Sequence, residues 1–86
     1  MKAWSVYILE CADGTLYTGI STDLCQRVQK HNEGKGAKYT RGRTPVTLIY
    51  AETCASHSEA LKREREIKAL SRDAKRKLAA AVPLQG

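Results

Sequence analysis

The sequence predicts one α+β domain over residues 1–86, in which a β-hairpin and a further strand are combined with helices. Runs rich in β-branched and aromatic residues cover 4–11, 16–20 and 46–54, and such runs are typical of strands. Outside them, apolar residues recur at helical spacing behind capping residues. The hydrophobic fraction of 42% allows a modest core and argues against disorder.

The first two strands are joined by an Ala-Asp-Gly segment at 12–14, which has the chemistry of a turn. A two-residue turn there would place Tyr7 and Tyr17 on opposite faces of the sheet. A three-residue loop with a left-handed glycine is equally standard, and it pairs Tyr7 with Gly19. We expect the three-residue loop, because both phenols then share one face and one site can use both.

A helix follows, with Thr22 as the expected N-cap and an end near residue 32 or 33, before Gly34. Four residues at helical spacing share one of its faces: Leu24, Arg27, Val28 and His31. Because the two apolar members must face the core, we expect Arg27 and His31 at its margin.

Residues 34–43 combine glycines with bases around a single tyrosine and predict a loop with room for one helical turn. This composition allows close backbone approach and phosphate contact, with the tyrosine free to stack on a base. A flexible, solvated connector is the alternative that the glycines alone would predict. The candidate nucleic-acid contacts in this loop are Lys35, Lys38, Tyr39, Arg41 and Arg43.

The third strand, 46–54, is nearly continuous in apolar residues, so we expect it at the centre of the sheet. Ser56 and Glu59 form a capping box that opens a helix over 57–70. We expect its apolar line to consist of Ala60, Leu61, Ile67 and Leu70. A last helix is expected at about 72–81, ended by Pro83.

Glu64 falls within the apolar line of the 57–70 helix. A carboxylate on the packed side of a helix needs a partner, since isolated burial of a charge is costly. The candidate partners are Arg27 in an ion pair and a bound divalent metal ion, and a purely structural salt bridge is the plainer alternative.

The positive charge of the chain is concentrated in one segment. The net charge is +6, and residues 26–43 hold six bases and one acid. Such clustering suits a polyanion such as nucleic acid, although net charge alone is equally compatible with ordinary solubility.

The three cysteines, Cys11, Cys25 and Cys54, are widely spaced and form no Cys-x-x-Cys pair. A zinc site that combined them with His31 and His57 would lack metal-ligand spacing. With no signal peptide or long apolar run, we expect reduced thiols in a cytoplasmic protein that has no membrane partner.

The candidate residues fit the hydrolysis of a phosphodiester bond. That reaction needs an activated water, charge stabilisation on the phosphoryl oxygens and help for the leaving oxygen. Arg27 can clamp a phosphate through its planar fork of donors or favour a nearby phenolate. One carboxylate is enough to hold Mg²⁺, which keeps most of its waters.

These residues and motifs together resemble the GIY-YIG nuclease superfamily, in particular its small single-domain bacterial members. The resemblance covers essentially the whole chain. It rests on Val6-Tyr7-Ile8, Tyr17-Thr18-Gly19-Ile20-Ser21-Thr22-Asp23-Leu24, Arg27, His31-Asn32, the segment 36–46, Glu59-Ala60-Leu61 and Glu64. Ile20 departs from relatives that carry a lysine there, a cation that Lys38 could replace.

The resemblance implies a central three-stranded antiparallel sheet flanked by helices and metal-dependent cleavage of DNA. It implies one Mg²⁺ or Mn²⁺ ion, no small-molecule cofactor and a monomer. By position it assigns Tyr7 and Tyr17 to the two motif tyrosines, with Tyr17 favoured for activating water. The remaining implied roles are the motif glycine, in contact with nucleic acid, for Gly19, phosphate contact for Arg27, a place near the active-site mouth for His31 and metal binding for Glu64.

The leading hypothesis is therefore a metal-dependent DNA endonuclease that acts in DNA repair or processing. The alternative is a catalytically weak or silent nucleic-acid-binding module that uses the same basic face. A structural or protein-interaction domain is a third possibility.

Overall fold

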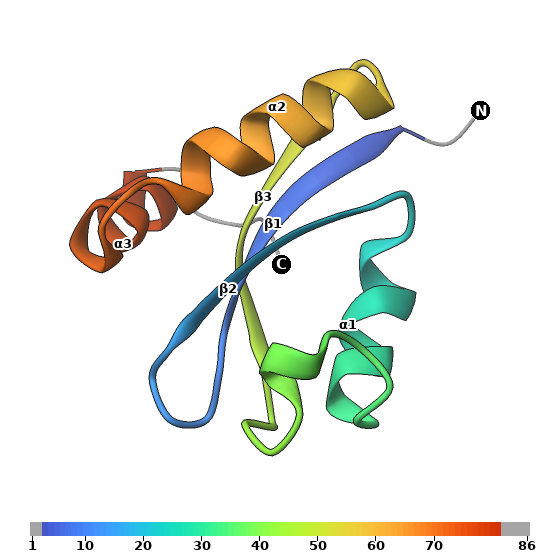
Figure 1. Ribbon diagram of the computed structural model, residues 1–86, viewed down its shortest axis with the longest axis vertical. Coiled ribbons are helices and arrows are strands. Elements are labelled where there is room, and N and C mark those ends of the chain that lie inside the picture. The colour runs from blue at the N-terminus through green and yellow to red at the C-terminus, as the bar shows by residue number, and fades with distance from the viewer. Residues whose placement is uncertain (1–2, 82–86) are drawn as a thin grey trace.

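A computed structural model describes residues 3–81 of the chain. Its strands are β1 (Trp4–Glu10), β2 (Leu16–Ser21) and β3 (Thr47–Cys54), which form an antiparallel sheet in the order β2-β1-β3 (Figure 1). The α+β fold with a three-stranded antiparallel sheet is thus confirmed.

The central strand is β1, so the expectation that the third strand would be central was wrong. Four consecutive residues of β1, 6–9, are fully buried, because helices or loops cover both faces of that strand. β3 is an edge strand, and most of its residues are only half-buried or exposed. Its apolar run reflects contact with β1 on one side and does not require a second neighbouring strand.

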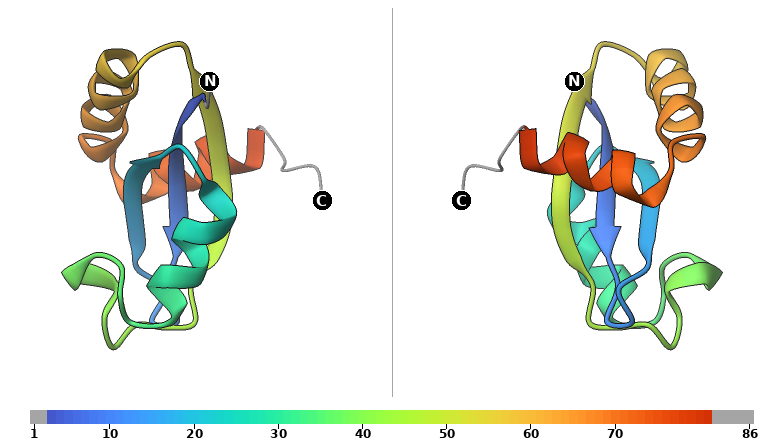
Figure 2. Two further views of the ribbon diagram at one scale, coloured as in Figure 1. Left: turned by 90° about the vertical axis from the view of Figure 1, so that its right-hand side faces the viewer. Right: turned by 90° about the vertical axis from the view of Figure 1, so that its left-hand side faces the viewer.

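The helices are α1 (Leu24–Asn32), α2 (His57–Lys68) and α3 (Arg72–Ala81), with a single 3₁₀ turn η1 (Lys38–Thr40) between α1 and β3. α1 lies on one face of the sheet and α3 crosses the other (Figure 2). Among the residues described, no helix combines the length and apolarity needed to cross a bilayer. The Pro83 expected to end α3 lies outside the described residues.

Helix ends differ from the sequence expectation by one or two residues. The carboxylate of Asp23 accepts a hydrogen bond from the Gln26 N–H at 3.1 Å, so Asp23, and not Thr22, is the N-cap of α1. The Ser56 hydroxyl accepts from the Glu59 N–H at 3.2 Å, as the capping box predicts. α2 ends at Lys68, two residues before the predicted end.

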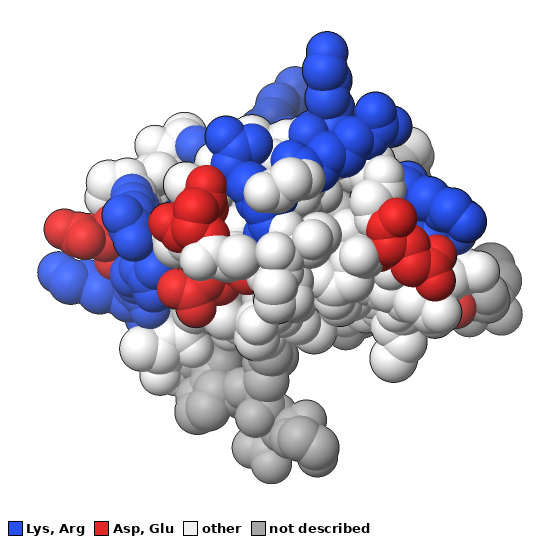
Figure 3. Space-filling model, turned by 90° about the horizontal axis from the view of Figure 1, so that it is seen from below, with Lys and Arg blue, Asp and Glu red and all other residues white. Residues whose placement is uncertain are grey.

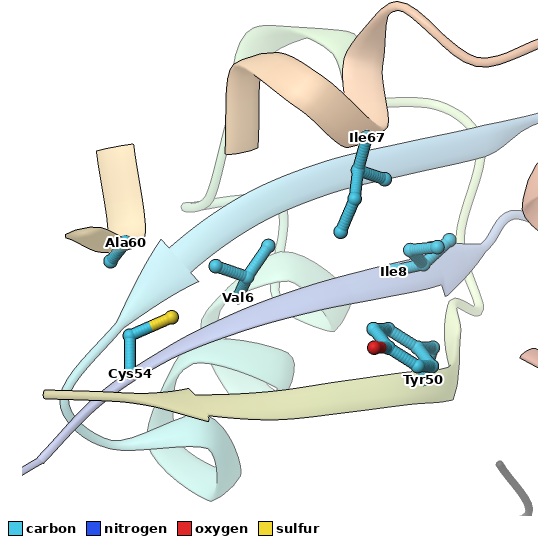
Figure 4. Close-up of a cluster of buried hydrophobic side chains, with 6 residues drawn as sticks. All are labelled: Val6, Ile8, Tyr50, Cys54, Ala60 and Ile67. Carbon is cyan, nitrogen blue, oxygen red and sulfur yellow. The ribbon is translucent and has the colours of Figure 1, made fainter. Parts of the chain in front are cut away.

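Residues of β1 alternate between two apolar clusters, one on each face of the sheet. Towards α2 and α3 lies the cluster drawn in Figure 4, which consists of Val6, Ile8, Tyr50, Cys54, Ala60 and Ile67. Towards α1 lies the second cluster, which consists of Tyr7, Leu9, Cys11 and Val46. The candidate site is built on this second face.

Only part of the expected apolar line of α2 is buried. Ala60 and Ile67, two helical turns apart, are fully buried, whereas Leu61 and Leu70 are 36% and 38% exposed. Leu61 is rotated by about 100° from Ala60 around the helix axis, and Leu70 lies beyond the helix end. Their inclusion in the core was therefore wrong.

Ile67→Ala should lower the free energy of unfolding by about 2–5 kcal/mol, because it leaves a cavity between α2 and the sheet. Leu61→Ala removes an aliphatic side chain from the same helix at an exposed position, and it should cost within about 0.5 kcal/mol. Urea unfolding of both variants measures the difference. Equal losses would show that α2 is not anchored through Ile67.

Candidate active site

The site begins with the register of the β1–β2 hairpin. The Cys11 carbonyl accepts from the Gly14 N–H at 2.9 Å, and the Cys11 N–H donates to Thr15 at 2.8 Å. Gly14 has a φ of 83°, so the hairpin has the expected three-residue loop with a left-handed glycine. Tyr7 therefore pairs with Gly19, and Leu9 with Tyr17.

Both phenols lie on the face that α1 covers, as the three-residue loop predicts. The ring centroids of Tyr7 and Tyr17 are 6.3 Å apart. A Cβ at Gly19 would lie 2.6 Å from the Tyr7 hydroxyl and 3.0 Å from a ring carbon of Tyr17. The space at Gly19 is thus filled by tyrosine side chains of the same chain, a different use from the nucleic-acid contact expected from the sequence.

His31 is held between two hydroxyl groups. Its Nδ1 lies 2.7 Å from the Thr40 hydroxyl, and its Nε2 lies 3.1 Å from the Tyr7 hydroxyl. The Thr40 hydroxyl has one proton, which it donates to the Ala37 carbonyl at 2.9 Å. Nδ1 must therefore carry the imidazole proton and donate to Thr40. Nε2 is then an acceptor, and Tyr7 donates to it.

The imidazole of His31 is fully buried. Burial lowers its pKa, and the nearby Arg27 charge lowers it further. A side chain at Gly36 would collide with the imidazole ring, so the glycine allows the loop to close over His31. The expectation that His31 stands at the mouth of the site is therefore wrong: it lies beneath Tyr7 and away from solvent.

Arg27 lies half-buried on α1, at the margin of the second cluster, as its helical spacing predicts. Its pKa is raised, chiefly because hydrogen bonding to Tyr7 stabilises the guanidinium charge, with a further contribution from Tyr17. Burial raises the pKa of Tyr7 in spite of Arg27, so this phenol stays protonated at neutral pH. The Arg27 charge thus interacts electrostatically with both phenols.

Glu64 extends from α2 towards the same group. Its side chain is only 17% exposed, and one carboxylate oxygen lies 3.3 Å from Lys68 Nζ. After burial and the charge of Tyr17, the Glu64 charge is a further, smaller cause that raises the pKa of Tyr7. The partner is therefore Lys68, one turn along the helix, which is the plain structural salt bridge among the alternatives. An ion pair between Glu64 and Arg27 does not form among residues 3–81.

The segment 34–43 is tied to the hairpin. Tyr39 stacks on Tyr17 with ring centroids 5.9 Å apart, and the Arg43 guanidinium lies 4.5 Å from the centre of the Tyr39 ring. Arg43 also donates to Asp13 at 3.0 Å, and its carbonyl accepts from the Ala12 N–H at 2.7 Å. These contacts favour a structured loop over a flexible connector.

The other bases of this loop remain available to a ligand. Lys35, Lys38 and Arg41 are exposed and form no ion pair with any residue between 3 and 81. Seen from below, Lys and Arg side chains gather along one margin of the molecule, with few acidic groups between them (Figure 3). This distribution suits a polyanionic partner.

Sequence reasoning missed Thr40 and Gly36, which orient and enclose His31, and Lys68, which holds Glu64. The i,i+4 spacing of Glu64 and Lys68 was a usable signal for that pair. For Thr40 the signal was weak, because a threonine in a glycine-rich basic loop is expected to be solvated.

The unfolding free energy should fall as the pH drops below about 6.5, the ordinary histidine pKa. Folding lowers the pKa of His31, so the unfolded chain takes up a proton at a pH where the native state does not. Urea unfolding at several pH values measures this slope. His31→Gln should reduce the slope, and a slope in this variant equal to that of the wild type would contradict the assignment.

Comparison with known proteins identifies the family. The family model described as the GIY-YIG catalytic domain matches residues 3–78. A "UPF0213 protein" of Desulfotalea psychrophila is 59% identical over 80 residues, which cover 92% of this chain and 73% of that protein. One of Halobacterium salinarum is 60% identical over 73 residues, which cover 85% and 95% respectively.

The fold comparison agrees. The solution NMR structure of a UPF0213 protein from Bacillus halodurans matches with a TM-score of 0.61 and 48% identity, over 94% of this chain and 86% of that one. A second solution NMR structure, from E. faecalis, matches with the same TM-score and 37% identity. Together with the family-model match, these relatives show that the chain belongs to the GIY-YIG family of nuclease domains.

Proposed function

We propose that this protein is a metal-dependent endonuclease that hydrolyses phosphodiester bonds in DNA. The observation that carries the proposal is the Tyr7 hydroxyl, which donates to a neutral, buried His31 and lies beside Arg27. The stability of an 86-residue fold does not require a phenol fixed in this way next to a second tyrosine and a carboxylate. Cleavage in DNA repair or processing is the cellular role that follows from this activity.

The two phenols have different roles in the proposed mechanism. Tyr7 is fully buried and its proton is directed to His31, so it acts as a positioning residue that orients Arg27. Tyr17 is only half-buried and stands closer to solvent. We assign to Tyr17 the contact with the attacking water, and to Arg27 the contact with the phosphate oxygens, since a planar guanidinium matches the phosphate geometry.

The donor set near Glu64 fits one divalent cation. Among residues 3–81 no three His, Cys, Asp or Glu side chains converge on a common point, so Glu64 would act as a single carboxylate ligand. Mg²⁺ tolerates such a site, because it retains waters and takes substrate oxygens as ligands, and Mn²⁺ prefers the same kind of oxygen ligands. The bound ion would supply Lewis-acid stabilisation of phosphoryl charge.

Substrate binding is assigned to the exposed bases of the loop, Lys35, Lys38 and Arg41. Each phosphate that they neutralise releases condensed counterions, so affinity should fall with salt. Arg43 contributes less to binding in this scheme, because Asp13 and the Tyr39 ring already engage its guanidinium.

The second candidate is a nucleic-acid-binding module without cleavage. The single carboxylate and its contact with Lys68 favour it, because this pair would have to open before Glu64 held a metal ion. The contact is half-exposed on the lysine side, at 52%. Such surface pairs contribute about 0–1 kcal/mol, so opening it is inexpensive.

Cleavage of DNA in Mg²⁺ should be lost in Tyr17→Phe and in Glu64→Gln. Removal of a general base typically lowers the rate by roughly 10²–10⁴-fold. The measurement is a cleavage screen over linear, nicked, flapped and branched DNA, with the wild type as reference. Calorimetric titration with Mn²⁺ should show binding to the wild type and none to Glu64→Gln.

Two matched variants control for loss of a hydroxyl or a carboxylate elsewhere. Tyr50→Phe removes a phenol hydroxyl that donates to Glu52 at 2.6 Å, on the opposite face of the sheet. Glu66→Gln removes an exposed acid on the same helix. Both should cleave as the wild type does. Salt-sensitive binding by a wild type that cuts none of the substrates would support the binding module and contradict the endonuclease.

A further inference from the structure

A pocket of about 360 Å³ opens beside the candidate active site. It lies where the edge of β2 meets α2, α3 and η1, and it is lined by Leu16, Tyr17, Thr18, Tyr39, Lys68 and Lys75. Tyr17 belongs to both the pocket and the active site, and Lys68 contacts the candidate metal ligand Glu64. A group bound in this pocket would therefore be a direct neighbour of the reacting phosphate.

The side of the pocket formed by β2 offers backbone donors and acceptors. β2 is an edge strand, paired only with β1. In the antiparallel ladder, the residues bonded to β1 alternate with residues whose N–H and C=O point away from it. The Cys11 N–H donates a hydrogen bond to the Thr15 carbonyl. Counting every second residue from Thr15, Tyr17 and Gly19 are the β2 residues whose backbone groups face β1. Leu16 and Thr18 therefore turn their backbone groups outwards, as free edge groups.

Thr18, which lines the pocket, has a buried hydroxyl without a hydrogen-bond partner in residues 3–81. Its side chain is 98% buried, since only 2% of the residue is exposed. Within the described chain its hydroxyl is the one buried side-chain oxygen or nitrogen that has no hydrogen-bond partner. Leaving a buried hydroxyl unpaired costs on the order of 1–3 kcal/mol. Because this oxygen is inaccessible in its present rotamer, a ligand in the pocket would bond to it only after the Thr18 side chain rotates.

The remaining walls combine aromatic surface with positive charge. Tyr17 and Tyr39 are stacked on one another, and Leu16 adds an aliphatic surface. Lys75 forms no ion pair with a residue of the described chain, and Lys68 is engaged only by Glu64. Aromatic and apolar walls, edge hydrogen bonds and flanking cations match a nucleobase with its neighbouring phosphates.

We propose that this pocket takes an unpaired nucleobase of the DNA substrate, with Lys68 and Lys75 on the flanking phosphates. The proposal deepens the endonuclease assignment and rests on it for the identity of the nucleic acid. A base that is paired and stacked in a duplex must first be extruded, which costs a few kcal/mol. The preferred substrate is therefore single-stranded or locally unpaired next to the cleaved bond.

Binding of labelled DNA to the full-length protein, followed by fluorescence anisotropy in EDTA, tests this without cleavage. Three probes of equal length are compared: a single-stranded oligonucleotide, a strand composed only of abasic units, and a blunt duplex. Base stacking contributes about 1–3 kcal/mol, so the base-bearing strand should bind at least about 5-fold more tightly than the abasic strand. The duplex should bind more weakly than the base-bearing strand.

Variants separate the base contact from the phosphate contacts. Tyr39→Leu should reduce the preference for base-bearing over abasic DNA. Lys75→Ala should weaken binding of both strands to a similar degree. Lys77→Ala removes the same charge from an exposed position of α3 outside the pocket, and it should cause a smaller loss than Lys75→Ala. Circular dichroism confirms that each variant is folded.

Equal affinity for base-bearing and abasic strands would overturn the pocket assignment, and so would tighter binding to duplex. Equal losses in Lys75→Ala and Lys77→Ala would also contradict it. None of these results bears on whether the protein cuts DNA. Conversely, a base-dependent preference in a wild type that cleaves no substrate would support the pocket and overturn the endonuclease.

Discussion

The site depends on one constraint, the three-residue loop that sets the register of β1 against β2. Its left-handed Gly14 places Tyr7 opposite Gly19, the only residue type that leaves room for the phenol. A shift of one residue would send every side chain of β2 to the other face, and Tyr17 would leave Arg27. Two ion pairs also hold the hairpin: Arg43 with Asp13 and Arg76 with Glu10.

The buried His31 links this hairpin to the basic loop. Its two ring nitrogens engage Thr40 in η1 and Tyr7 in β1, so the loop conformation and the direction of the phenol proton are set together. A charged imidazole would lose the acceptor that Tyr7 needs, and the low dielectric around it disfavours that charge. The segment that presents bases to nucleic acid is thus fixed by the same interaction that orients the tyrosine.

Patterns with local causes were readable from the sequence. The strands follow from local composition. The loop type at 12–14, and with it the shared face of the tyrosines, was instead preferred over an equally standard turn because one site could then use both phenols. Other features depend on tertiary contacts that no local pattern encodes. The central place of β1 is set by its pairing with both other strands, and the burial of His31 and the role of Thr40 arise when the loop folds over α1. Sequence placed Glu64 on a packed helix side, but only the structure shows Lys68 as its partner.

Lys68 is the residue at which the active site and the neighbouring pocket meet. It contacts Glu64 at 3.3 Å and also lines the pocket beside Tyr17. In the proposed scheme, a cation on Glu64 would compete with the lysine for the same carboxylate, so ion binding would release Lys68 towards a phosphate. A phosphate that draws Lys68 away must, by linkage, strengthen ion binding at Glu64 by the same factor. The short helical spacing of these two residues would therefore make substrate binding and metal binding cooperative.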